Sequence, residues 1–451
     1  MEVNEVSGLG APGASGRIFR LMRTIASRLT FTFLLIGLAA SPAITTAPPD
    51  PLPIGAAERQ GFSAERLARM HTRLREFVDK GQHAGVVSLI ARNGQIVDWQ
   101  TWGQRDREAK LPMEKDTIFR VYSMTKIVTS AAIMQLHERA LLRLDDPVEK
   151  HLPALAKREV MTGDTAAAPE LVPANRSVRI KDLLTHTSGY IYPGMFGKAP
   201  IDEFYTSAGV TTAQTMDEFV ERLARVPLSH QPGERFSYGV SIDVLGAIVA
   251  KVSGQAFDAY VAEHITRPLK MLDTAFEVPA AKRHRLAKVY TAGKDGTLTP
   301  VPPDQLTMTS LDKGHMHWGG AGLFSTVGDY ARFGQMLLNG GELDDARILG
   351  RKSVELMMAN ALTQTPTPYR TGTDYDGFGY GGAVRVDLAR SARLGSVGQF
   401  GWSGAATTYF NIDPQERTVA LVFTQHFPHD QHQLYWTFST LFYASLVDAT
   451  K

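Results

Sequence analysis

Two hairpin patterns near opposite ends of the chain constrain its fold most strongly. In the first, residues 86–101 form two strand-like runs on either side of Asn93-Gly94, the dipeptide that favours a tight two-residue turn. In the second, residues 405–424 form two such runs on either side of the turn-forming segment 413–417. The economical assembly is one antiparallel sheet built from both chain ends.

Helical patterns flank both hairpins. The apolar side chains of residues 63–80 fall on one side of a helix, and they are Leu67, Met70, Leu74, Phe77 and Val78. A second helix of about residues 433–447 closes the chain, and the middle is mainly helical and rich in loops. The sequence therefore predicts an α+β fold, with a discontinuous sheet domain (residues 55–120 and 375–451) beside a mainly helical domain (residues 121–374).

Composition narrows the class of protein further. A chain of 451 residues with 43% hydrophobic residues can bury a large core. The net charge is only +2 and no basic run is interleaved with aromatic residues, so we expect no nucleic-acid partner. Cysteine is absent, which excludes disulfides and thiolate metal sites.

The N-terminal region has the pattern of a secretory signal. Four arginines precede the apolar run of residues 29–40, and small residues and prolines follow it. We expect a signal peptide of about residues 1–43, or a shorter one if Met22 is the true start. The apolar run is short for a membrane span. We therefore expect export to the periplasm or the medium without a stable membrane span, and a retained anchor is the alternative.

The segment Ser123-Met124-Thr125-Lys126 carries the first candidate catalytic residues. The apolar residues 127–136 that follow predict a buried helix opening at or near Ser123. Residues i and i+3 share a helix face, so the Lys126 amine should lie beside the Ser123 hydroxyl. A desolvated lysine can take the serine proton, and the Ser123 N–H at the helix start can donate to a developing oxyanion.

A Ser-x-x-Lys tetrapeptide also arises by chance, as an ordinary helix start. Four further segments decide between the two interpretations. With the first, they form a family pattern in order along the chain: FRVYSMTK at 119–126, LLTHTSG at 183–189, PGERFSY at 232–238, GGAGLFST at 319–326 and GWSG at 401–404. From about Phe62 onward the chain resembles the serine β-lactamase and penicillin-recognising superfamily, in particular the class C-like branch with the family VIII carboxylesterases.

This resemblance implies a β-lactamase-like fold and a second catalytic residue. The family's Tyr-x-Asn motif corresponds to Tyr238-Gly239-Val240, so Tyr238 takes the role of a proton-relay partner for Lys126. Val240 stands where the family has an asparagine and cannot hydrogen-bond a substrate amide. The alternative for Tyr238 is a packed aromatic residue before a helix.

The third family motif lies on a strand that lines the site, and here it is Trp402-Ser403-Gly404. Trp402 carries no charge, so recognition of a substrate carboxylate at that position is not expected, and a Trp-x-Gly motif resembles the family VIII esterases. By resemblance the Ala405 N–H is the second oxyanion donor. Ser403 either contacts the substrate or is a plain strand residue.

Histidines offer a metal site as an alternative chemistry. His426, His429 and His432 are closely spaced, as are His315 and His317. No carboxylate-bearing helix motif accompanies them, and serine chemistry needs no metal. We therefore interpret them as polar loop residues and expect neither a metal nor a cofactor. His186 precedes Thr187-Ser188-Gly189, a turn-like sequence, and is interpreted as structural.

Together these observations predict an exported serine hydrolase that cleaves small, uncharged carboxylic esters through an acyl-enzyme on Ser123. A β-lactamase or D-amino-acid peptidase or transesterase of the same fold is the first alternative, with a β-lactam as a further substrate. A non-catalytic binding or scaffold protein of the penicillin-recognising fold is the second. The sequence makes no prediction about the oligomeric state.

Overall fold

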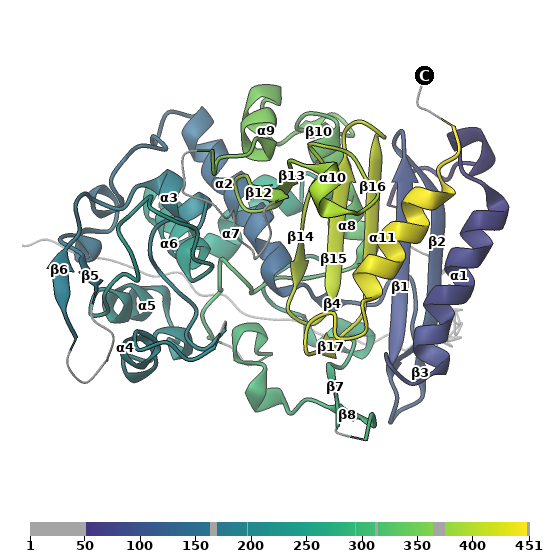
Figure 1. Ribbon diagram of the computed structural model, residues 1–451, viewed down its shortest axis with the longest axis horizontal. Coiled ribbons are helices and arrows are strands. Elements are labelled where there is room, and N and C mark those ends of the chain that lie inside the picture. The colour runs from purple at the N-terminus through teal and green to yellow at the C-terminus, as the bar shows by residue number, and fades with distance from the viewer. Residues whose placement is uncertain are drawn as a thin grey trace, which may run out of the picture. The chain divides into compact units, whose positions relative to one another are not determined.

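The computed structural model describes residues 51–162, 169–195, 197–293, 295–311, 314–363 and 375–448 (Figure 1). The chain divides at Pro48, and everything below belongs to the unit Pro49–Lys451. The expected signal peptide lies outside the described residues. Within the described ranges, every helix is too short or too polar to cross a membrane.

An eight-stranded antiparallel sheet forms the frame of this unit (Figure 1). The strands from one edge to the other are β12 (Asp376–Phe378), β13 (Ala383–Arg385), β14 (Phe400–Gly404), β15 (Thr408–Asp413), β16 (Thr418–Phe423), β1 (Gly85–Arg92), β2 (Gln95–Asp106) and β3 (Leu111–Pro112). Strands β1 and β16 join the two chain ends, with Leu89 paired to Leu421. The predicted sheet from both ends of the chain is therefore confirmed.

Both predicted hairpins form, because their turn residues suit the backbone that a tight turn needs. Asn93 and Gly94 have φ angles of 53° and 77°, the left-handed values that Asn and Gly adopt most easily. The second hairpin joins β15 to β16, with Asp413 paired to Thr418 across the turn. In both cases a local signal in the sequence was sufficient to place two strands.

One face of the sheet is covered by the two terminal helices, α1 (Ala64–Asp79) and α11 (Leu434–Ser445), which lie side by side (Figure 1). Ser63 caps α1 by accepting a hydrogen bond from the Arg66 N–H at 3.4 Å. Four of the five predicted apolar residues of α1 are buried against the sheet: Leu67, Met70, Leu74 and Phe77. Burial of each contributes about 1.5–3 kcal/mol.

The other face packs against α8 (Val327–Leu338) and, beyond it, α2 (Thr125–Glu138) and α6 (Ser241–Ser253). Helix α8 belongs to the sequence range assigned to the helical domain, yet it contacts β1, β15 and β16. The main hydrophobic core therefore continues from the sheet into the helices. The predicted domain boundaries themselves stay a prediction.

The remaining elements are short. The other helices are α3 (Ile180–Leu184), α4 (Asp202–Ser207), α5 (Met216–Leu223), α7 (Phe257–Val261), α9 (Arg351–Met358) and α10 (Leu388–Ser391). Small strand pairs are β4 (Phe119–Arg120) with β9 (Phe324–Ser325), β5 (Glu159–Met161) with β6 (Leu171–Pro173), and β10 (Glu342–Leu343) with β11 (Ala346–Arg347). Strands β7 (Tyr290–Ala292), β8 (Leu298–Pro300) and β17 (His426–Phe427) form a three-stranded sheet.

Candidate active site

Ser123 lies in a single 3-10 turn, Tyr122–Met124, immediately before α2. The sequence placed the helix start at or near Ser123, and the α-helix begins two residues later, at Thr125. Tyr122 has a left-handed φ of 42°, which is uncommon for a residue with a Cβ and marks a locally constrained backbone. Ser123 is half-buried, whereas residues 125–136 of α2 are buried all round. The serine is therefore held at the accessible end of a rigid core helix.

Lys126 lies one turn along α2 and is fully buried. Its Nζ donates to Ser123 Oγ at 3.2 Å and to the Gly320 carbonyl oxygen at 2.7 Å. The same Nζ lies 4.6 Å from the centre of the Tyr238 ring. The predicted Ser-Lys pair is thus close enough for proton transfer, and Lys126 is kept from water, as a lysine base requires.

Tyr238 reaches the same place from the segment before α6, and Trp402 reaches it from β14. The Trp402 Nε1–H donates to the Tyr238 hydroxyl oxygen at 3.1 Å, and the two rings lie 5.6 Å apart. The structure therefore brings together Ser123, Lys126, Tyr238 and Trp402, which come from three separate parts of the sequence.

Gly404 allows β14 to approach the segment that carries Ser123. A Cβ on Gly404 would lie 2.4 Å from the Val121 carbonyl oxygen, so any larger residue would push the strand away. This close approach brings Ala405, the residue after β14, to the same cavity as Ser123. Ser123 and Ala405, the two predicted oxyanion donors, therefore line one space.

That cavity has a volume of about 620 Å³, and Ser123, Tyr238, Trp402, Ser403 and Ala405 all line it. Its volume is within the range of small-molecule sites, about 300–1,000 Å³. The Ser403 Oγ lies 3.0 Å from His429 Nε2, so Ser403 is engaged with a histidine of the neighbouring loop.

Two buried residues that the sequence interpretation missed complete the surroundings of Lys126. The Tyr192 hydroxyl lies 3.5 Å from Lys126 Nζ and donates to Asp243 Oδ2 at 2.7 Å. The other carboxylate oxygen, Oδ1, accepts from the Gly320 N–H at 2.7 Å. The sequence did offer one signal for Asp243, because it is an acidic residue within the apolar run of α6. A buried acid is rare without a partner, so this position could have been singled out.

Burial and neighbouring charges shift the pKa values of Asp243 and Tyr192. Burial raises the pKa of Asp243, and the positive charge of Lys126 and the bonds from Gly320 and Tyr192 act in the opposite direction. Burial and the Asp243 charge hold the pKa of Tyr192 well above its usual value. Tyr192 is therefore a neutral hydrogen-bond donor that links the carboxyl to the surroundings of the lysine.

His186 packs against the Tyr238 ring and binds the next residue of the chain, Gly239. Its Nδ1 accepts from the Gly239 N–H at 3.3 Å, and its ring lies 4.6 Å from the Tyr238 ring. Burial, followed by the charge of Lys126, holds the pKa of His186 well below its usual value, so the ring is neutral. These contacts agree with a structural role for His186.

The C-terminal histidines divide between two environments. His429 faces the cavity, whereas His426 and His432 pack against His83, with ring centres 4.9 Å and 5.5 Å from the His83 ring. Across the described ranges, His, Asp and Glu side chains nowhere gather in threes with a geometry that could hold a metal ion.

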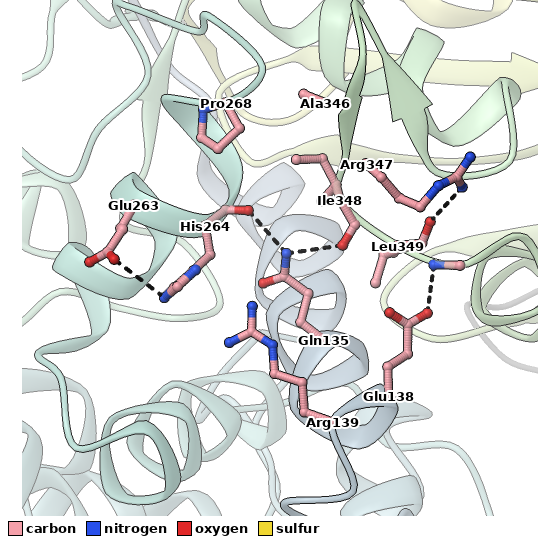
Figure 2. Close-up of a pocket in the computed structure, with 11 residues that line it drawn as sticks. Gln135, Glu138, Arg139, Glu263, His264, Pro268, Ala346, Arg347, Ile348 and Leu349 are labelled. Atoms are coloured by element: carbon pink, nitrogen blue, oxygen red, sulfur yellow. Dashed lines mark hydrogen bonds and ion pairs between the residues drawn. The ribbon is translucent and has the colours of Figure 1, made fainter.

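A second cavity, of about 430 Å³, lies at the opposite end of α2 (Figure 2). There Gln135 Nε2 donates to the carbonyl oxygens of His264 and Ile348 at 3.0 Å and 3.1 Å. Glu138 Oε1 accepts from the Gly350 N–H at 2.6 Å. Figure 2 shows these bonds fixing the far end of α2 to its neighbours, which helps to hold the helix that carries the serine and lysine.

The fold and this constellation define a class: proteins with an α+β β-lactamase fold and a Ser-x-x-Lys motif. The family model described as Beta-lactamase matches residues 70–441. Protein Rv1367c of Mycobacterium tuberculosis is 36% identical over 369 residues, covering 79% of this chain and 89% of that protein. Esterase EstB of Burkholderia gladioli is 31% identical, covering 76% and 86%.

Among solved structures, "EstCE1, a hydrolase with promiscuous acyltransferase activity" superposes with a TM-score of 0.71 at 26% identity, covering 84% of this chain and 99% of that one. The chain therefore belongs to the Beta-lactamase family, and it is a serine hydrolase or acyltransferase of that family.

Proposed function

We propose that the protein hydrolyses small carboxylic esters through a covalent acyl-enzyme on Ser123. The observation that carries this proposal is the 3.2 Å contact between the buried Lys126 amine and the Ser123 hydroxyl. The 31% identity to esterase EstB supports an ester as the substrate.

Acylation begins when Ser123 Oγ attacks the ester carbonyl carbon and its proton passes to Lys126. The negative charge that develops on the carbonyl oxygen is held by the N–H groups of Ser123 and Ala405. The bond to the alcohol oxygen then breaks, and the alcohol leaves with a proton from the Lys126–Tyr238 pair. The acyl group remains as an ester of Ser123.

Deacylation repeats these steps with water as the nucleophile. The same pair takes a proton from water, whose oxygen attacks the acyl carbon. The bond to Ser123 Oγ breaks, the serine regains its proton, and the carboxylic acid leaves.

The hydrogen bond from Trp402 makes the Tyr238 oxygen an acceptor in this relay. An indole N–H can only donate, so in the 3.1 Å bond the Tyr238 oxygen must accept. In the proposed relay the tyrosine O–H donates toward the lysine or the leaving group, and the Trp402 N–H stabilises negative charge on the tyrosine oxygen in the transition state. The tryptophan thus supplies a donor without a positive charge.

Two side chains favour an ester over a lactam. Val240 is fully buried and offers no polar atom to hold the amide side chain of a penicillin-like substrate. Trp402 is uncharged, so a carboxylate next to the reacting bond has no cation at that position. An ester needs neither this hydrogen bond nor this ion pair, because its alcohol is a better leaving group than an amine.

Acyl transfer is the second candidate. The cavity of about 620 Å³ has room for an alcohol acceptor as well as the acyl group. A structure at 26% identity is described as that of a hydrolase with promiscuous acyltransferase activity. In this case an alcohol would replace water in the second half of the reaction.

One screen tests these candidates. The purified protein and its Ser123→Ala variant are assayed with p-nitrophenyl esters of graded chain length, a chromogenic cephalosporin and a D-Ala-D-Ala peptide. We expect hydrolysis of the esters by the wild type alone, with an acyl mass increment on Ser123. A preference for the peptide or the cephalosporin would overturn the ester assignment. No turnover together with no labelling by a fluorophosphonate would favour the scaffold alternative.

A further inference from the structure

The catalytic cavity continues well beyond the reacting groups. It starts at Ser123 on one side of β14 and extends to residues of α11 and of the segment after α10, such as Trp436 and Leu394. Strand β13 pairs only with Phe400 and Gly401 of β14. In the described ranges the rest of β14 therefore has no strand neighbour on that side, and the cavity can pass around it.

Three large apolar side chains of the cavity are partly exposed. Met195, Leu394 and Trp436 line the cavity, and 49%, 48% and 50% of their respective surfaces are exposed. Exposed apolar side chains lose contact with water when a ligand covers them. A ligand with an apolar part therefore suits this cavity.

The charged residues of the cavity leave one cation without a carboxylate partner. Arg385 is paired with Asp376 at 2.5 Å. Asp430 accepts from the Tyr435 N–H at 3.0 Å and so caps α11. The Arg393 guanidinium has no carboxylate partner among the described residues and lies 5.9 Å from the ring centre of Tyr375.

From this arrangement we propose that Arg393 binds a carboxylate of the substrate, at a position separated from the ester bond by an apolar spacer. The inference rests on the proposed ester hydrolysis and specifies its substrate class. A guanidinium held against an aromatic ring presents a fork of N–H donors that matches a carboxylate. Burial raises the pKa of the cavity carboxylate Asp430 and the charge of Arg393 acts in the opposite direction, but these two described side chains form no ion pair, and Asp430 Oδ1 accepts from the Tyr435 N–H.

This proposal revises the expectation of an uncharged substrate while keeping the prediction for penicillins. A penicillin carries its carboxylate close to the reacting bond, where Trp402 offers no charge. Arg393 belongs to a different element, after α10, and lines the same cavity as the apolar residues Leu394 and Trp436. We therefore expect the arginine to meet a carboxylate that an apolar spacer separates from the ester bond.

The test compares two esters of one chain length. p-Nitrophenyl octanoate ends in a methyl group, and the p-nitrophenyl monoester of octanedioic acid ends in a carboxylate. We expect the wild-type kcat/KM to be about fivefold or more higher for the acid, a modest value because Arg393 is exposed. The preference should shrink in about 1 M salt, where the screening length falls to about 3 Å.

Arg393→Gln should remove this preference, with a much smaller effect on hydrolysis of the neutral octanoate than on that of the acid. Arg390→Gln is the matched control, because Arg390 is also exposed, lies 3.6 Å from Asp387 and does not line the cavity. A second pair, the 4-carboxybenzyl and 4-methylbenzyl esters of butyric acid, tests a carboxylate on the alcohol side. The pair of esters whose carboxylate preference is lost in Arg393→Gln shows whether the substrate carries its carboxylate on the acyl or the alcohol side.

The outcomes separate the two proposals. Hydrolysis of the neutral esters without a carboxylate preference in either pair would overturn the Arg393 proposal and leave ester hydrolysis standing. An equal effect of Arg390→Gln and Arg393→Gln would also overturn it, because general surface charge would then explain the preference. No hydrolysis of any of the four esters would overturn both proposals.

Discussion

The hydrogen bond from Trp402 to Tyr238 can be tested by replacing Trp402 with phenylalanine. This change removes the indole N–H and keeps an aromatic ring against Tyr238 and Phe378, whose ring centres lie 5.6 Å and 5.2 Å from that of Trp402. The loss should therefore fall on the 3.1 Å bond rather than on packing.

The size of the effect depends on the charge of the Tyr238 oxygen in the transition state. A hydrogen bond to a charged group contributes about 1.5–3 kcal/mol, which corresponds to about 10- to 150-fold in rate. A bond to a neutral hydroxyl contributes about 0.5–1.5 kcal/mol, or about 2- to 12-fold. We expect the larger range, because the proposed proton relay places negative charge on this oxygen.

Steady-state kinetics with p-nitrophenyl butyrate provide the assay. We expect kcat to fall about 10- to 150-fold while KM changes by less than about threefold, since the bond is strongest in the transition state. Trp402→His, which keeps an N–H donor, should recover part of the loss, and thermal unfolding should show that all variants fold. An unchanged kcat for Trp402→Phe, or a change in KM alone, would refute the reasoning.

Four further predictions follow from the same geometry. Ser123→Ala should abolish ester hydrolysis with nearly unchanged thermal unfolding, because the Ser123 side chain caps neither the 3-10 turn nor α2. Lys126→Ala and Tyr238→Phe should each lower kcat by orders of magnitude, and the double variant should lose little more, since the two share one relay; additive losses would indicate independent roles. Asp243→Asn should lower kcat about 10-fold or more with folding preserved, because it removes the buried charge linked to Lys126 through Tyr192 and Gly320; unchanged kinetics would limit Asp243 to packing. Burial, followed by the charges of His426 and His432, lowers the pKa of His83 well below 6.5, so only the unfolded chain gains its proton as the pH falls below about 6.5. The free energy of unfolding should therefore decrease on acidification, by up to about 1.4 kcal/mol per pH unit from this group, and urea titrations of His83→Gln should show a smaller decrease.

The parts of the fold that were predictable have strong local signals. Asn93-Gly94 fixes a turn by its own backbone preference, and the apolar spacing of α1 marks a helix within one residue of each observed end. The packing of α8 on the sheet had no such signal, because it depends on contacts with strands distant in the sequence. Strands β12 and β13 have only three residues each, too few to show an alternating pattern.

The residues of the candidate site also divide into those that the sequence could predict and those that it could not. Ser123 and Lys126 are three residues apart on adjoining turns, so elementary helix geometry placed them together. Tyr238, Trp402 and Ala405 were reached only through the family resemblance, and their roles stay predictions. Tyr192 and Asp243 form a bond across 51 positions of the chain. No pattern in the sequence states that a tyrosine in one loop and an acid within α6 will meet beside the lysine.

Because Trp402 is uncharged, the positive charge in the candidate site depends on Lys126 and its neighbours. With an uncharged tryptophan at the third motif, Lys126 is the only residue able to carry a positive charge in the set formed by Ser123, Lys126, Tyr238, Trp402 and Asp243. The positive charge that Lys126 gains with the serine proton in the proposed relay is balanced from one side by Asp243, acting through Tyr192 and Gly320. Tyr238 is supported from the other side by a neutral donor. A site of this kind gathers little positive charge around the reacting bond, which agrees with the proposed neutral ester there and with the proposed binding of a separate substrate carboxylate by Arg393.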